Sequence, residues 1–128
     1  MPRGMGTLYW QLNDNWPVAS WSSIDYHGCW KATHYMAKHF FAPLLVSGQE
    51  DAEKGTVEVH VTSDLLKPVS GTVTWTVTDL AGNELLQGSK NIRAASGANR
   101  KVSTIRLKKL INELGERNLL FWLDLNAK

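Results

Sequence analysis

The sequence contains one cysteine, Cys29, which excludes a disulfide within the chain and leaves no Cys-x-x-Cys metal motif. An excess of charge is also missing. The 14 basic and 12 acidic side chains give a formal net charge of +2, too small and too scattered to predict a nucleic-acid partner. The longest uncharged apolar run, Phe40 to Val46, is far shorter than the roughly 20 residues of a membrane-spanning helix, so no membrane partner is predicted.

The four histidines show no zinc-type arrangement. His34 and His39 are five residues apart, whereas two ligands on one helix face are four apart. We therefore predict neither a metal nor another cofactor. The first residues, Met1 to Gly6, show neither the apolar region nor the cleavage site of a signal peptide, so the sequence specifies no compartment.

With 128 residues, the chain has room for one domain, or for one domain and an appendage. A complete (β/α)₈ barrel is excluded, because it needs about 250 residues. The apolar share of 43% and the charged share of 20% are those of an ordinary globular protein, so a packed core is expected.

The composition changes near Pro43. Four of the six tryptophans and all three tyrosines precede this residue, whereas β-branched residues prevail after it. We interpret this change as a boundary between two structural parts, residues 1–43 and residues 44–128.

The first part has the pattern of a single βα unit. Thr7 to Leu12 is short, uncharged and rich in aromatic and β-branched residues, which predicts a buried strand. Asn13 to Pro17 then favours a turn. Apolar residues recur at helical spacing from Cys29 to Ala42, which predicts a helix that Pro43 ends.

The second part alternates with a period of two, as half-buried strands do. The clearest strands are residues 57–61 and 72–78, followed by a hairpin turn at 79–83 and further strands at 84–88, 102–107 and 121–125; a short helix is expected at 107–114. About five antiparallel strands of this kind predict an immunoglobulin-like β-sandwich. The chain stops at Lys128 just after a strong strand, which leaves open that the sandwich lacks a final strand.

A dense run of aromatic and turn residues identifies a resemblance. Five segments resemble the end of the catalytic barrel in β-mannosidases of glycoside hydrolase family 2. They are Gly6 to Pro17, Ser20 to Tyr26, Trp30-Lys31, His34-Tyr35 and Phe40 to Leu44. The remaining two thirds match that family only in pattern, as the β-sandwich that follows the barrel. The resemblance implies a mainly β chain, in which an immunoglobulin-like sandwich is preceded by one strand-loop-helix unit left over from a (β/α)₈ barrel.

The resemblance also implies a sugar-contact site. It places Tyr9 and Trp10 on the eighth barrel strand and the following turn at the carboxyl end of that strand, where barrel enzymes build their sites. Indoles suit an apolar sugar face, and amides and carboxylates suit hydroxyl groups. The candidate substrate-binding residues are Trp10, Asn13, Asp14 and Trp16. In the alternative, Trp10 fills the barrel interior, and Asn13 and Asp14 cap the turn.

No catalytic residue is predicted in this chain. Retaining glycosidases use two carboxyl groups about 5 to 5.5 Å apart, and in the family that this chain resembles both are glutamates on earlier barrel strands. The acids of the first part are Asp14 and Asp25, and neither occupies a matching position. A solvated loop is the structure that we expect for the acids Glu50, Asp51 and Glu53. We therefore expect this chain alone to be inactive.

Three hypotheses follow. The chain is a fragment of a retaining β-mannosidase, the parent enzyme, which would remove terminal β-linked mannose from a glycan in a periplasmic, secreted or lysosomal setting. Alternatively, it is a non-catalytic carbohydrate-binding module or a structural immunoglobulin-like module. A sugar-binding β-domain would need Trp75 and Trp122 exposed together on one face. The free edges of the strand Thr7 to Leu12 also predict self-association of the isolated chain.

Overall fold

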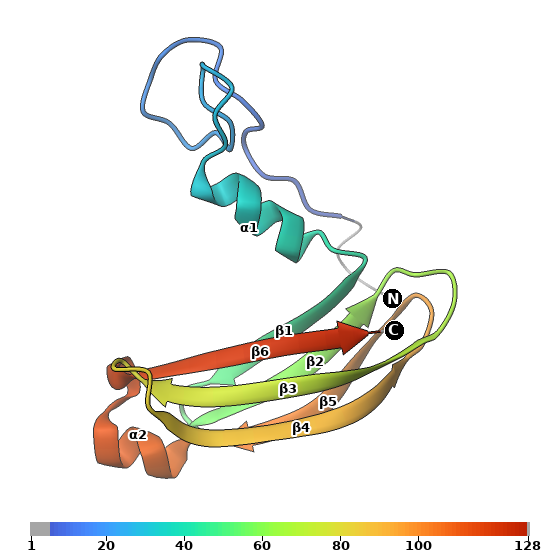
Figure 1. The fold of residues 1–128 in the computed structure, drawn as a ribbon, viewed down its shortest axis with the longest axis vertical. Coiled ribbons are helices and arrows are strands. Elements are labelled where there is room, and N and C mark those ends of the chain that lie inside the picture. The colour runs from blue at the N-terminus through green and yellow to red at the C-terminus, as the bar shows by residue number, and fades with distance from the viewer. Residues whose placement is uncertain (1–5, 128) are drawn as a thin grey trace. The chain divides into compact units, whose positions relative to one another are not determined.

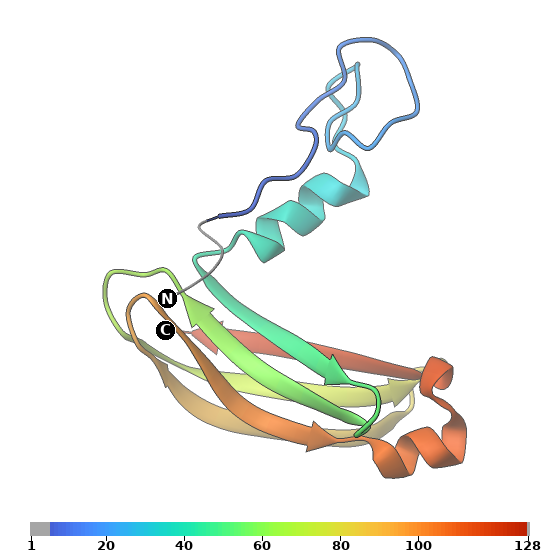
Figure 2. The same ribbon diagram turned by 180° about the vertical axis from the view of Figure 1, so that it is seen from behind.

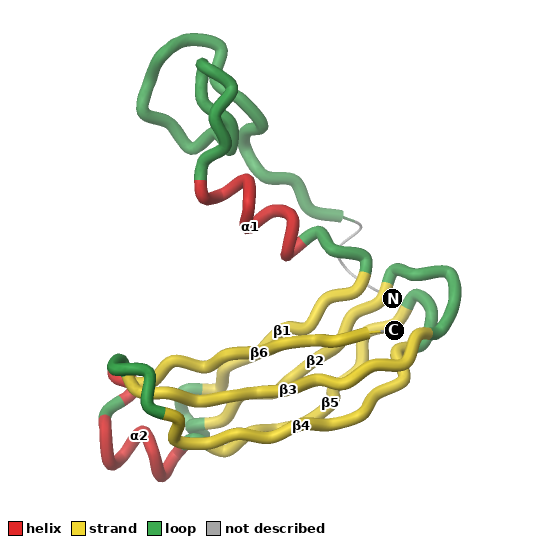
Figure 3. Tube along the Cα trace, in the orientation of Figure 1, coloured by secondary structure: helices red, strands yellow, loops and turns green. Residues whose placement is uncertain are grey.

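The computed structural model describes residues 6–127 and divides into two compact units, one up to Ala42 and one from Pro43 onward. The second unit, called here the β-domain, contains six strands in two antiparallel three-stranded sheets (Figures 1 and 3). The strands are β1 (Leu44–Asp51), β2 (Thr56–Ser63), β3 (Val69–Asp79), β4 (Glu84–Ala94), β5 (Ala98–Arg106) and β6 (Leu119–Ala127).

The sheets have the strand orders β1-β2-β5 and β4-β3-β6. Figure 2 shows the first of these sheets in front of the second. Each sheet turns one row of side chains toward the other, and the core lies between them. Val59 on β2 and Val73 and Val77 on β3 have no solvent exposure at all. The prediction of a mainly β fold with an immunoglobulin-like sandwich is therefore confirmed.

The alternation of side chains explains the core strands. On β2 the residues from Val57 onward are alternately buried and partly exposed, as expected for a strand with one face on the core. On β3 the threonines at 72, 74, 76 and 78 face outward, opposite the buried valines. Full burial of a valine side chain stabilises a fold by about 1.5–3 kcal/mol, so this inner row is a main source of the stability of the β-domain.

Two elements of the β-domain have other bounds than the sequence predicted. Glu50 and Asp51 do not lie in a loop but end strand β1, and the turn covers the residues that follow. The short helix α2 spans Lys108–Leu114, and Gly115 follows it with φ of +84°, a backbone conformation that favours glycine. A 3₁₀ turn, η1 (Glu116–Asn118), then leads into β6.

Residues 6–42 of the first unit contain one helix, α1 (Ala32–Phe40), which is shorter than the predicted 29–42. The predicted strand at Thr7 to Leu12 is wrong for this chain, because no ladder forms there. Only its end is paired: Asn13 forms a parallel bridge with Ile24, and Ser23 N–H donates to Gln11 O at 3.0 Å. A strand needs a hydrogen-bonded neighbour along its length, and residues 6–127 offer none to Thr7–Tyr9. The predictions for residues 1–5 lie outside the described residues.

Within residues 6–127, no helix combines the length and the apolar character that crossing a membrane requires.

Candidate functional site

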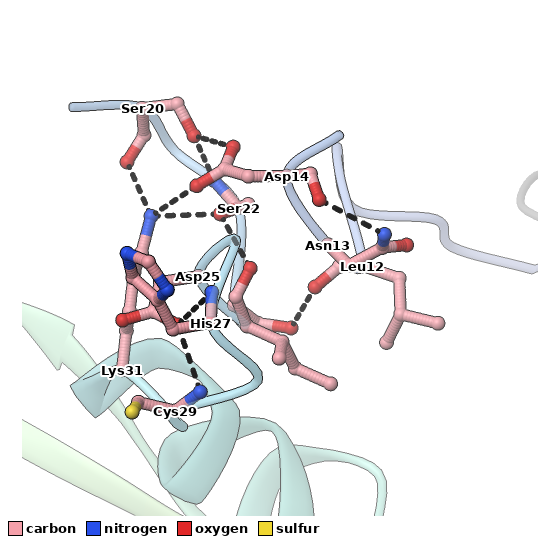
Figure 4. A network of polar contacts seen from close by, with 11 residues as sticks. Leu12, Asn13, Asp14, Ser20, Ser22, Asp25, His27, Cys29 and Lys31 are labelled. Carbon is pink, nitrogen blue, oxygen red and sulfur yellow. Dashed lines mark hydrogen bonds and ion pairs between the residues drawn. The ribbon is translucent and has the colours of Figure 1, made fainter. Parts of the chain in front are cut away.

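A buried carboxylate organises the loop that carries the candidate residues (Figure 4). The side chain of Asp14 is only 1% exposed. It accepts a hydrogen bond from the Ser20 hydroxyl and forms an ion pair with Lys31, with 2.9 Å between Lys31 Nζ and Asp14 Oδ2. Lys31 Nζ also donates to Ser22 Oγ at 2.7 Å. These contacts join the segment after Leu12, the segment at Ser20–Ser22 and the start of α1 into one network.

The electrostatics of this network favour the ionised form of Asp14. The hydrogen bond from Ser20 and then the one from the Lys31 ammonium lower the pKa of Asp14 from 3.8 to about 2. Burial opposes this change but is the weaker influence. Asp14 therefore stays a carboxylate above about pH 4, and both of its oxygens are engaged within the unit.

A second set of hydrogen bonds lies beneath the same loop. Ser23 is fully buried, and its hydroxyl donates to Leu12 O at 2.9 Å. The same Oγ lies 3.1 Å from Tyr9 Oη and 3.2 Å from His34 Nδ1. Because its proton is directed to Leu12 O, this serine acts as a structural junction, and not as a nucleophile paired with His34.

Asp25 shapes the turn before α1. Its Oδ1 accepts hydrogen bonds from the backbone N–H of His27 at 2.9 Å and of Cys29 at 2.8 Å, and Gly28 adopts φ of +84°. Cys29 is thus held in a turn, which explains why α1 begins only at Ala32. The Cys29 thiol is exposed, and no base contacts it among the described residues.

Three of the four candidate residues are exposed to solvent. Trp10 is 74% exposed and Trp16 is 61% exposed, and Asn13 is exposed with its Nδ2 donating to Asp14 O at 3.2 Å. Trp10, Asn13 and Trp16 thus present an indole, an amide and a second indole to solvent, whereas Asp14 is buried. Lys31 and Ser20, which hold this loop, were not among the predicted site residues.

The acidic side chains of this loop are not arranged for catalysis or for binding a metal ion. Asp14 and Asp25 are the only acids before Glu50, and each is engaged in the backbone or ion-pair contacts described above. Residues 6–127 contain no group of three or more side chains suited to hold a metal ion.

The two tryptophans of the β-domain lie on opposite faces of their sheet. Trp75 is on the inner face and packs against the core, in line with Val73 and Val77. Trp122 is on the outer face, 56% exposed, and its Nε1 donates to Thr78 Oγ1 at 3.1 Å. They do not form the shared aromatic platform that a carbohydrate-binding β-domain would need, so no observation favours that alternative.

The fold defines an immunoglobulin-like sandwich joined to an aromatic loop-helix unit, and comparison with known proteins identifies its family. The Mannosidase Ig/CBM-like domain family matches residues 55–128, more than half of the chain, and the chain belongs to this family. The prediction of a β-mannosidase resemblance is confirmed.

Individual relatives extend the similarity beyond that domain. Beta-mannosidase A of Aspergillus terreus is 38% identical over 112 residues, which are 87% of this chain, and that of Aspergillus clavatus is 45% identical over 83 residues, which are 65% of it. A crystal structure of Beta-D-Mannosidase from Dictyoglomus thermophilum matches 91% of this chain with a TM-score of 0.74 at 24% identity, which shows a shared fold. The chain spans only 12% and 9% of the two Aspergillus proteins and 14% of the Dictyoglomus chain.

Proposed function

We propose that this chain is part of a retaining β-mannosidase of glycoside hydrolase family 2, which removes terminal β-linked mannose from glycans. The observation that carries the proposal is the 38% identity to Beta-mannosidase A of Aspergillus terreus over 87% of the chain. A match of that length includes residues of both units, so a relationship through the β-domain alone does not account for it.

In this proposal, residues 1–43 are the last βα unit of the catalytic barrel. Trp10 is the platform for a sugar ring, because an exposed indole stacks well on the apolar face of a pyranose. Asn13 and Trp16 contribute hydrogen bonds and further apolar contact. Asp14, the remaining candidate, has both oxygens engaged by Ser20 and Lys31, which favours a role in holding the loop over direct sugar contact.

Residues 44–128 serve as scaffold. Their core is made only of residues from within the β-domain, and Trp75 is part of its inner face. The β-domain would brace the barrel of the parent enzyme, and the glycan would reach this chain only through the barrel-derived unit.

Cleavage requires groups that this chain does not carry. A retaining mechanism needs one carboxyl group as acid/base and another as nucleophile about 5–5.5 Å away, and no glutamate precedes Glu50. The purified 128-residue chain should therefore release no product from an aryl β-mannoside, with a full-length fungal β-mannosidase as the positive control. Turnover that co-purifies with the chain would contradict the proposal.

A further inference from the structure

One flank of the β-domain holds a pocket between its two sheets. The edge strands there are β4 and β5, and the connection formed by residues 95–97 joins one to the other (Figures 1 and 2). The pocket has a volume of about 160 Å³. All the residues that line it belong to the β-domain, and they form an apolar floor and a cationic rim.

The floor is part of the hydrophobic core. Val61, Ala94 and Val102 are buried core residues, and Ile92 packs against them while remaining partly exposed. An apolar cavity of about 150 Å³ is large enough to bind benzene. The pocket therefore has room for a small ring or a short hydrocarbon on its floor.

The rim carries four basic side chains and no acidic one. They are those of Lys90, Arg93, Arg100 and Lys101, all of them exposed. Glu58 neutralises Lys101, at 2.9 Å between Oε1 and Nζ. Within residues 6–127 the other three form no ion pair. Three unneutralised like charges around one pocket repel one another, and an anion placed between them would remove that repulsion.

Lys90 is held in position from within the sandwich. It is opposite the fully buried Val73, so it belongs to the inner row of β4. Its Nζ crosses to the other sheet and donates to Val102 O at 2.6 Å. The β2–β5 ladder shifts register between Val59 and His60, which leaves Val102 without a partner on β2. An ammonium group has three N–H donors, so two remain for a ligand.

The two arginines approach the pocket from different strands. Arg100 is opposite the buried Val61, so it belongs to the inner row of the edge strand β5. Arg93 lies near the end of β4. A guanidinium group presents its N–H groups as a planar fork that binds two oxygens of one phosphate or carboxylate group. These side chains are therefore suited to an oxyanion.

We propose that this pocket binds a phosphate monoester with a small apolar body. The phosphate lies between Lys90, Arg93 and Arg100, and the apolar body lies on the floor. A phosphate monoester carries about −1.5 to −2 charges at pH 7 and three terminal oxygens, which match three cationic groups. A carboxylate has one charge and two oxygens, and it leaves part of the rim unneutralised.

Titration of the ¹⁵N-labelled 128-residue chain with phenyl phosphate, followed through amide chemical shifts, tests the proposal at about pH 7.5, where this probe is mostly a dianion. We expect saturable shifts of the amides of Ala95 and Ala98, which line the pocket. Benzoate has the same ring with a single charge, and inorganic phosphate has the charge without the ring. Each should bind at least about tenfold more weakly than phenyl phosphate.

Arg93→Gln and Arg100→Gln should each weaken the binding of phenyl phosphate at least about tenfold, because each removes charge-assisted hydrogen bonds. Both side chains are exposed, so these variants should stay folded, and the dispersion of the amide spectrum verifies it. Arg106→Gln is the matched control. It removes the same charge from the same strand, β5, at a residue outside the lining of this pocket, and it should leave the affinity unchanged.

Four results would overturn the proposal. The first is a titration without saturable shifts, and the second is one whose shifts leave out Ala95 and Ala98. The third is benzoate or inorganic phosphate binding as tightly as phenyl phosphate, which would show that the site does not select both parts of the ligand. The fourth is equal weakening by Arg106→Gln and Arg100→Gln, which is the behaviour of a general attraction between anions and a basic surface.

Discussion

Lys31 forms an ion pair with the buried carboxylate of Asp14, 17 positions earlier in the chain, at a distance of 2.9 Å between Nζ and Oδ2. The same ammonium donates to Ser22, so one side chain fastens two segments of the loop that presents Trp10 and Trp16. The order of this loop should therefore depend on the charge of Asp14.

Asp14→Asn removes the charge and keeps the size of the side chain. We expect the loop to loosen, because a neutral amide cannot form the ion pair, and Lys31→Met should have the same effect. Amide hydrogen exchange of Asp14 and Ile24, whose N–H groups bond Ile24 O and Leu12 O, is the readout. Asp124→Asn, on β6, is the control and should leave both amides as protected as in the unchanged chain.

Lowering the pH should break the ion pair between Lys31 and Asp14. The pKa of Asp14 is about 2 in the folded chain against 3.8 without its partners, so the carboxylate contributes stability that is fully present above about pH 4. That contribution is lost as the pH falls from about 4 to about 2. Near-UV circular dichroism of the tryptophans should follow this transition, and it should be absent from Asp14→Asn. A transition of equal size in that variant would assign it to another group.

Gly88 makes room for Trp75. The two residues are opposite each other on β4 and β3, and a Cβ at position 88 would lie 2.4 Å from Cζ2 of the indole. Gly88→Ala should therefore displace the ring and destabilise the β-domain by about 1–3 kcal/mol, as overpacking does. Ser89→Ala, one residue along on the outward face, should change stability by less than about 0.5 kcal/mol. Urea denaturation measures both.

The β-domain should fold by itself. Its core is composed entirely of residues between 44 and 125, so a chain of residues 43–128 retains all of it. We expect one cooperative thermal transition at the temperature of the β-domain transition in the whole chain, within about 4 °C, equivalent to under about 1 kcal/mol. A shortened chain without a cooperative transition would show that the division at Pro43 is not a domain boundary.

The sequence was most informative where the signal is local. Alternating valines and threonines predicted β2 and β3, because each strand has one face on the core and one in water. Strand β1 was not recognised, since Gly48 and the acids at its end interrupt the alternation. The helix was predicted too long, because the backbone contacts of Asp25 with His27 and Cys29 hold those residues in a turn.

Non-local partners account for the remaining differences. Residues 7–12 have the composition of a buried strand, but a ladder also requires neighbours along its length, and composition does not supply them. The four candidate residues were chosen as the end of one strand and the turn that follows it, whereas the structure separates exposed Trp10 and Trp16 from buried Asp14. The partner of Asp14 is 17 residues away, and no helical or strand period connects two positions at that spacing.

The central claim is that residues 1–43 form part of a β-mannosidase site, and a chimera tests it most directly. The 112 matched residues of this chain would replace the equivalent segment of Beta-mannosidase A of Aspergillus terreus, and kcat/KM would be measured on an aryl β-mannoside. We expect an active chimera in which Trp10→Ala lowers kcat/KM at least about tenfold, or about 1.4 kcal/mol in transition-state binding. Trp21→Ala, at an equally exposed tryptophan outside the proposed contact set, should have little effect. A folded chimera without activity, or one indifferent to Trp10→Ala, would contradict the account.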